Sequence, residues 1–123
     1  MSRYRRSHAP GTSYFFTVNT YHRQRLLPHP EVLTTLRNAL RAVRDQHPFR
    51  IDALVVLPDH LHALWTLPPG DADYAIRWSL IKRQVSQSSR YLIVQPQSAS
   101  RSKRREIGFW QRRYWEHLIR DNA

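Results

Sequence analysis

The sequence predicts an α+β domain of the ferredoxin-like, split βαβ kind: an antiparallel sheet with two helices on one face. Apolar residues recur with a period of two in strands and of about 3.6 in helices. Segments of the two kinds follow one another in the order strand, helix, strand, strand, helix, strand. In addition, the second and third strands are joined by so short a turn that they should form an antiparallel hairpin. The 123 residues fit a single domain, 1–123, without an internal repeat.

The first strand and the first helix are separated by a polar loop that contains two prolines. The strand comprises residues 13–20 (SYFFTVNT), which are rich in aromatic and β-branched side chains. The helix comprises residues 31–46; Glu31 suits the positive end of its dipole, and Pro48 stops it. One side of this helix is apolar and consists of Val32, Leu33, Leu36, Ala39, Leu40 and Val43.

The hairpin, the second helix and a final strand complete the order. Residues 51–57 (IDALVVL) predict a mostly buried strand, and residues 60–67 (HLHALWTL) predict its partner across a Pro-Asp turn. Asp71 or Asp73 is suited to cap the next helix. Residues 109–119 (FWQRRYWEHLI) predict the last strand. The apolar stripe of the second helix is made of Tyr74, Trp78, Ile81 and Val85.

The charge of the chain indicates a polyanionic partner, most often nucleic acid. There are 20 Lys and Arg residues against 9 Asp and Glu residues, and the formal net charge is +11. Residues 1–12 form a basic arm, and residues 95–108 form a polar, basic loop that is expected to be mobile. The absence of cysteine excludes disulfides, thiolate zinc sites and a cysteine nucleophile. No apolar run is long enough to predict a membrane span.

Two histidines stand out in the predicted second strand of the hairpin. His60 and His62 are two residues apart, so both point to one face of the sheet, while Leu61, Ala63 and Trp65 point to the other. The histidines therefore take the face away from the helices. Two converging imidazoles can hold a divalent metal and leave positions open for further ligands. The alternative is a pair of half-exposed polar residues without a ligand.

Several segments of the chain resemble one family of transposases. The stretch 58–65 (PDHLHALW) resembles the His-hydrophobic-His motif of nucleases and transposases that act on single-stranded DNA. That triplet is short, but further blocks stand in the same order as in the REP-associated tyrosine transposases. These blocks are residues 4–6 (YRR), 11–18 (GTSYFFTV), 55–62 (VVLPDHLH), 77–82 (RWSLIK) and 110–120 (WQRRYWEHLIR).

The resemblance implies a bacterial protein that works in the cytoplasm, at the nucleoid, and has a ferredoxin-like fold. Such proteins cut and rejoin single-stranded DNA at repetitive extragenic palindromes, which fold into hairpins. They need Mg²⁺ or Mn²⁺, and the resemblance assigns the metal to His60 and His62. A tyrosine attacks the scissile phosphate, remains joined to the 5′ side and frees a 3′ hydroxyl. Neither the oligomeric state nor the DNA sequence recognised follows from the resemblance.

The resemblance also locates the family's nucleophile. It places the attacking tyrosine on a helix beyond the 110–120 block, followed one turn later by an Asn or Gln that is the third metal ligand. Neither has a counterpart in residues 1–123, so the nucleophile is expected outside this chain. Tyr114, between Arg113 and Trp115, is the alternative within it.

DNA contacts are expected from arginine, which binds phosphates and stacks on bases, and from aromatic side chains. Alternatively, Trp110 and Trp115 belong to the core and the loop arginines are merely solvated. Two functions remain: a transposase of this family, or a non-catalytic hairpin-binding fragment or remnant of one. The candidate DNA-binding residues are Tyr4, Arg5, Arg6, Lys82, Arg83, Arg104, Arg105, Arg112, Arg113 and His117.

Overall fold

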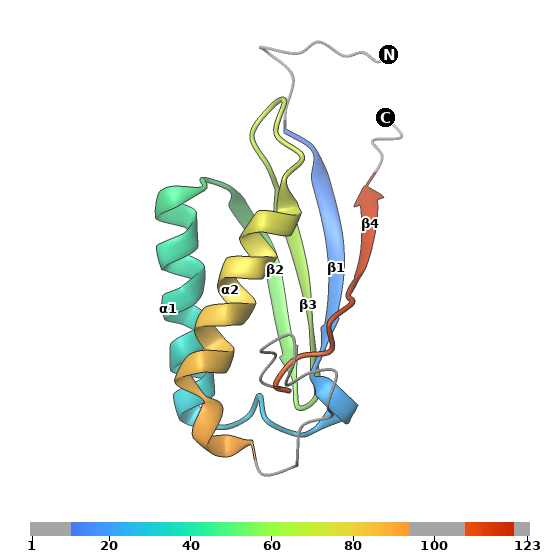
Figure 1. The fold of residues 1–123 in the computed structure, drawn as a ribbon. Helices are drawn as coiled ribbons and strands as arrows, with labels where there is room; N and C mark the ends of the chain where they lie inside the picture. The colour runs from blue at the N-terminus through green and yellow to red at the C-terminus, as the bar shows by residue number, and fades with distance from the viewer. Residues whose placement is uncertain (1–10, 94–107, 120–123) are drawn as a thin grey trace.

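A computed structural model of the chain describes residues 11–93 and 108–119. The N-terminal arm up to residue 10 and loop residues 95–107 lie outside these ranges, so the mobility expected of the loop is not tested. Six elements form the domain and two short 3-10 turns connect them (Figure 1). In chain order, these are β1 (Ser13–Asn19), η1 (Tyr21–Arg23), α1 (Pro30–Gln46), β2 (Arg50–Leu57), β3 (His60–Thr66), α2 (Tyr74–Ser88), η2 (Arg90–Leu92) and β4 (Trp115–Ile119).

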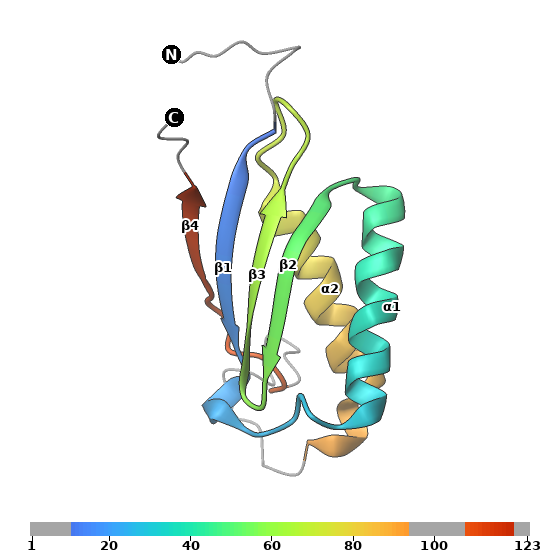
Figure 2. The ribbon, with the colours of Figure 1, turned by 180° about the vertical axis from the view of Figure 1, so that it is seen from behind.

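The strands form one antiparallel sheet in the order β2-β3-β1-β4. Both helices lie on the same side of this sheet, as the front and back views show (Figures 1 and 2). This element order and strand order are those of the split βαβ fold, so the predicted fold class is confirmed. The face without helices is called the open face below. No helix in residues 11–93 and 108–119 is long and apolar enough to cross a membrane.

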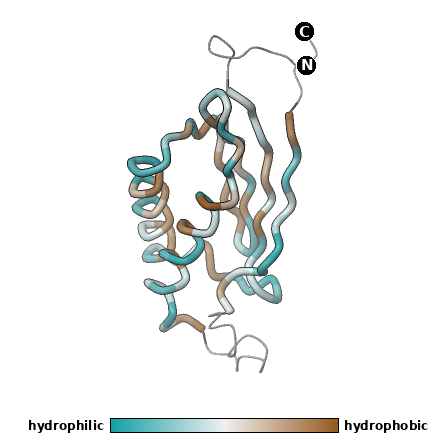
Figure 3. The backbone as a smooth tube through the Cα atoms, turned by 45° about the horizontal axis from the view of Figure 1, so that its top comes forward, coloured by the Kyte–Doolittle hydropathy of each residue, from teal (hydrophilic) through white to brown (hydrophobic). Residues whose placement is uncertain are grey.

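The helices begin and end where their capping residues allow. Helix α1 starts at Pro30, one residue before the predicted start, because proline suits the first helical position. Helix α2 starts after Asp73, whose side chain accepts a hydrogen bond from the backbone N–H of Ile76, as a capping residue does. Figure 3 shows the hydrophobic positions of α1 on the side turned toward the rest of the domain. Its buried residues are Val32, Leu36, Ala39, Leu40 and Val43.

The core lies between the helices and the sheet and contains a cluster of aromatic rings. Trp65 of β3 stacks on Trp78 of α2 with ring centroids 4.3 Å apart, and Phe16 of β1 packs against both. All three side chains are buried. Because strand side chains alternate, burial of these residues puts their neighbours on the open face.

Two strand predictions are corrected by the structure. Strand β2 was expected to be mostly buried, but it is an edge strand, and Leu54, Val55 and Leu57 are exposed. The last strand is shorter than 109–119. Trp110 pairs with Thr20 in an isolated bridge, and the chain joins the sheet again only at β4.

Arg77 of α2 is a buried charge that joins three parts of the helical layer. Its five N–H groups are all used: two reach the carboxylate of Asp71, and the others reach the carbonyl oxygens of His47, Pro48 and Asp73. The side chain is 2% exposed. The guanidinium therefore ties the end of α1 to the start of α2, and no other side chain has five donors in this geometry.

We predict that Arg77→Ala lowers the free energy of unfolding by about 3 kcal/mol or more, because buried carbonyl groups and Asp71 lose their donors. Arg50→Ala is the control. Arg50 also pairs with an aspartate, Asp52, but its side chain is 70% exposed. That variant should lose about 1 kcal/mol or less. Urea denaturation of the two variants measures the difference, and equal losses would contradict the role given to Arg77.

Candidate metal and nucleic-acid site

His60 and His62 lie on the open face, as the period of β3 predicts. Leu61, Ala63 and Trp65, which alternate with them, are buried under the helices. The two imidazole rings have their centroids 5.0 Å apart at an angle of 81°. Both side chains are partly accessible, so they can meet a ligand that approaches from solvent.

The Nδ1 atom of each histidine is held by a neighbouring side chain. His60 Nδ1 lies 2.8 Å from Asp59 Oδ1, and His62 Nδ1 lies 3.0 Å from Thr17 Oγ1. Thr17 stands directly opposite His62 in the β1–β3 register. An ionised carboxylate only accepts, so Nδ1 of His60 carries the proton and Nε2 keeps its lone pair. This is how metal-binding histidines are usually oriented by their neighbours.

Asp59 is itself paired with a cation. Arg23 Nε donates to Asp59 Oδ2 at 3.0 Å, so each carboxylate oxygen has one partner. The hydrogen bonds from His60 and then from Arg23 lower the pKa of Asp59 to about 2. Asp59 is therefore an ionised carboxylate at neutral pH.

Aromatic rings continue from the histidines across the sheet. Phe15 of β1 stacks on His62 at 5.4 Å and meets Trp115 of β4 edge-on at 6.1 Å. Trp115 and His117 are parallel within 4° at 5.4 Å. We call His62, Phe15, Trp115 and His117 the aromatic row. Trp115 is 54% exposed, which is unusual for a tryptophan.

Known proteins share this fold and much of this sequence. The profile of the family described as "Transposase IS200 like" matches residues 10–122. A REP-associated tyrosine transposase of Escherichia coli K12 is 39% identical over 125 residues, which is 98% of this chain and 64% of the relative. A Haemophilus influenzae protein described as a candidate of the same kind is also 39% identical, over 99% of this chain and 68% of its own length.

The chain belongs to the REP-associated tyrosine transposases of the IS200-like family. It spans about two thirds of the length of these relatives.

Solved structures agree with the fold. A REP-associated tyrosine transposase bound to a REP hairpin superposes with a TM-score of 0.69 at 39% identity, covering 99% of this chain and 64% of that one. A Deinococcus radiodurans protein described as a candidate transposase has a TM-score of 0.68, with 98% and 88% of the two chains covered. Its identity is 20%, so it supports the fold alone.

Tyr114, the alternative nucleophile, does not share a face with the histidines. Its ring packs against Phe16, Tyr74 and Trp78 on the helix side of the sheet, and the ammonium of Lys82 lies 5.4 Å from the ring centroid. Burial, together with Tyr74 and nearby carboxylates, raises the pKa of Tyr114 to about 12. A partly buried phenol with a raised pKa is a poor nucleophile, so we assign Tyr114 a packing role against the core.

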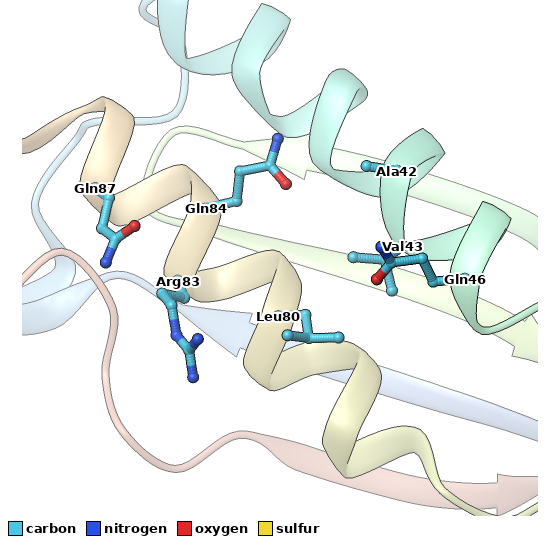
Figure 4. A pocket seen from close by; sticks show the side chains of 7 residues that line it. All are labelled: Ala42, Val43, Gln46, Leu80, Arg83, Gln84 and Gln87. Carbon is cyan, nitrogen blue, oxygen red and sulfur yellow. The ribbon is translucent and has the colours of Figure 1, made fainter.

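The candidate DNA-binding residues occupy different places. Lys82 donates to the carbonyl oxygens of Gln111 and Arg112, so it holds the segment before β4. Arg83 is on α2 and is one of the residues that line a groove of about 300 Å³ between α1 and α2; its guanidinium points away from α1 (Figure 4). Arg112 and Arg113 are exposed just before β4, and His117 is in the aromatic row. Tyr4, Arg5, Arg6, Arg104 and Arg105 lie outside the described residues.

The two tryptophans left open by the sequence have different roles. Trp110 is 6% exposed and donates from its indole nitrogen to the carbonyl oxygen of Lys82, so it belongs to the core. Trp115 belongs to the open face.

Sequence reasoning missed several residues around the histidines. Thr17 and Phe15 meet His62 only because of the strand register, which the sequence does not contain. Asp59 was noted only as part of the turn and of the 58–65 block, without a role of its own, although its position next to His60 was a usable signal. Arg23 carried no sequence signal, because 37 residues separate it from His60.

We predict that the free energy of unfolding falls as the pH rises from about 10 to about 12. An unfolded tyrosine ionises near its ordinary pKa of 10, whereas folded Tyr114 stays neutral up to about 12. A raised pKa contributes stability that is complete below pH 10 and is lost as the pH passes the folded value. Denaturation curves across this range should show a smaller fall for Tyr114→Phe than for the wild type; identical curves would contradict the buried position.

Proposed function

We propose that this chain binds single-stranded or hairpin DNA across its open face and holds a divalent metal ion there, as part of a transposase that cleaves and rejoins DNA. The observation that carries the proposal is the placement of two oriented imidazoles and an exposed aromatic row on one face. A solved relative is described as bound to a REP hairpin, and we extend that substrate class to this chain.

The donor chemistry of the two histidines supports a metal site. Both Nδ1 atoms are engaged, which leaves the Nε2 atoms of His60 and His62 as ligands. In residues 11–93 and 108–119 no group of three or more His, Cys, Asp or Glu side chains could complete the site. We therefore expect Mg²⁺ or Mn²⁺ to bind weakly, with other ligands coming from water, phosphate or residues outside these ranges. When bound, such an ion offsets the charge of a phosphate oxygen.

The aromatic row supports the binding of unpaired bases. Every base has a flat face, so exposed rings such as those of Trp115 and His117 stack on single strands without a sequence preference. Arg113, exposed just before β4, is placed to contact the DNA backbone near these rings. The arm with Arg5 and Arg6 and the loop with Arg104 and Arg105 are proposed to add phosphate contacts.

Cleavage requires a nucleophile. We do not assign this role to Tyr14, Tyr74 or Tyr114, because their rings pack on the helix side of the sheet, away from the histidines. The attacking tyrosine is proposed to lie outside residues 1–123, as the family pattern implies. The packing of Tyr114 against the core also favours a second candidate function for these residues by themselves, namely hairpin binding without cleavage.

We predict that His60→Ala weakens Mn²⁺ binding by at least about tenfold, because even groups that only orient a metal ligand contribute about 10–100-fold to affinity. Titration of Mn²⁺, followed through the electron paramagnetic resonance signal of the free ion, measures the constant. His47→Ala is the matched control, since His47 follows α1 on the helical side. If both variants bind Mn²⁺ like the wild type, the metal site is not at His60.

We also predict that a REP-type hairpin with a single-stranded 5′ flank binds more tightly than a duplex of equal length, and that Trp115→Ala removes most of this preference. Loss of one stacked base is worth about 1–3 kcal/mol, or roughly 5- to 150-fold in the dissociation constant. Tyr91→Ala is the control, because Tyr91 is 59% exposed but lies in η2 beside His29.

The salt dependence of these affinities distinguishes binding through phosphate contacts from binding through base stacking. Phosphate contacts weaken with salt for every DNA, whereas a stacking preference persists as both affinities fall. Fluorescence anisotropy at several salt concentrations measures both. Equal affinity for the flanked hairpin and the duplex at every salt concentration would reduce the chain to a general basic binder.

A further inference from the structure

The turn before α1 contains two consecutive residues in an unusual backbone conformation. His22 and Arg23 have φ angles of 54° and 55°. These values lie in the left-handed region, which residues other than glycine rarely adopt. A glycine at either position would adopt it without cost. Left-handed residues other than glycine persist where the surrounding structure holds them, and they cluster at functional sites.

Backbone hydrogen bonds hold this turn against the β2–β3 hairpin. The N–H of Thr20 donates to the carbonyl oxygen of Asp59 at 3.0 Å, and the N–H of Leu27 donates to that of Pro58 at 3.1 Å. Thr20 is 1% exposed, and its hydroxyl also lies 3.1 Å from the Asp59 carbonyl oxygen. The turn and the residue before His60 are therefore one unit.

The side chain of Arg23 uses this placement to reach Asp59. One carboxylate oxygen accepts from Arg23 Nε at 3.0 Å, and the other accepts from His60 Nδ1 at 2.8 Å. Arg23 Nη2 is also 3.4 Å from His60 Nδ1, but a protonated Nδ1 cannot accept from it. The shorter, charge-assisted bond to Asp59 decides the tautomer, and the guanidinium acts on the imidazole through the carboxylate.

We propose that Arg23 is a positioning residue of the metal site. It fixes the Asp59 carboxylate, which keeps the proton of His60 on Nδ1 and presents Nε2 to the metal. The left-handed turn is the backbone geometry that puts Arg23 within reach of Asp59. This inference rests on the proposed function, in which His60 and His62 hold a divalent ion.

The test compares Arg23→Ala, Arg23→Gly and Asp59→Asn with the wild type in Mn²⁺ titrations and thermal unfolding. Both Arg23 variants should bind Mn²⁺ about tenfold more weakly or worse, as loss of an outer partner does. Arg23→Gly should unfold at a higher temperature than Arg23→Ala, because only glycine accepts the left-handed φ. The double variant Arg23→Ala/Asp59→Asn should bind no more weakly than Asp59→Asn alone, since both changes break one chain of contacts.

His22→Gly is the matched control. It relieves the same kind of backbone strain one residue earlier, at a side chain that stacks on Tyr21 rather than reaching Asp59. Its Mn²⁺ affinity should equal that of the wild type. If it falls as far as that of Arg23→Gly, the turn and not the guanidinium matters, and the inference is overturned.

The outcomes separate this inference from the proposed function. If His60→Ala weakens Mn²⁺ binding and Arg23→Ala does not, Arg23 is only a surface ion pair and the inference fails while the metal site stands. If the wild type binds Mn²⁺ no more tightly than His60→Ala, the metal site fails, and this inference fails with it. Additive losses in the double variant would likewise overturn the route through Asp59.

Discussion

Strand β3 lies between β2 and β1, so each of its side chains faces either the helices or the open side. Leu61, Ala63 and Trp65 are buried, and this burial forces His60 and His62 to the opposite face. A shift of one residue in register would bury both imidazoles and expose a tryptophan. The same apolar residues that stabilise the core therefore also fix the face on which the candidate site lies.

In the helical layer, two basic side chains bind other parts of the protein. Arg77 uses its five donors to join α1, α2 and the segment between β3 and α2, and Lys82 holds the backbone just before β4. Both cations thus bind groups of the protein itself, although the net charge of +11 indicates a polyanionic partner for the basic residues as a whole. The basic residues that bind other groups of the protein are less available for DNA. The net charge of a chain therefore overestimates the number of cations that can contact a nucleic acid.

Periodicity predicts the element order, both helices and the face of the histidines, because these depend on neighbouring residues. The burial of a strand and its contacts with other segments depend on the order and register of the strands, which the sequence does not show. An apolar run such as residues 51–57 is expected to be buried, but β2 lies at an edge. The contact of Thr17 with His62 needs the register, and that of Arg23 with Asp59 needs two left-handed residues. In 109–119 the period is interrupted, so Trp110 and Trp115 could not be assigned to core and surface.

A carboxylate at a site for phosphates would repel its substrate unless its charge were offset. Both oxygens of Asp59 are engaged, one by His60 and one by Arg23, so the carboxylate serves the imidazole instead of facing the ligand. Mg²⁺ and Mn²⁺ prefer oxygen ligands, and the described residues offer two nitrogens. On the proposed function, the missing oxygens come from water in the protein alone and largely from DNA in the complex, so the metal is held weakly by the protein alone and more tightly when the nucleic acid is present.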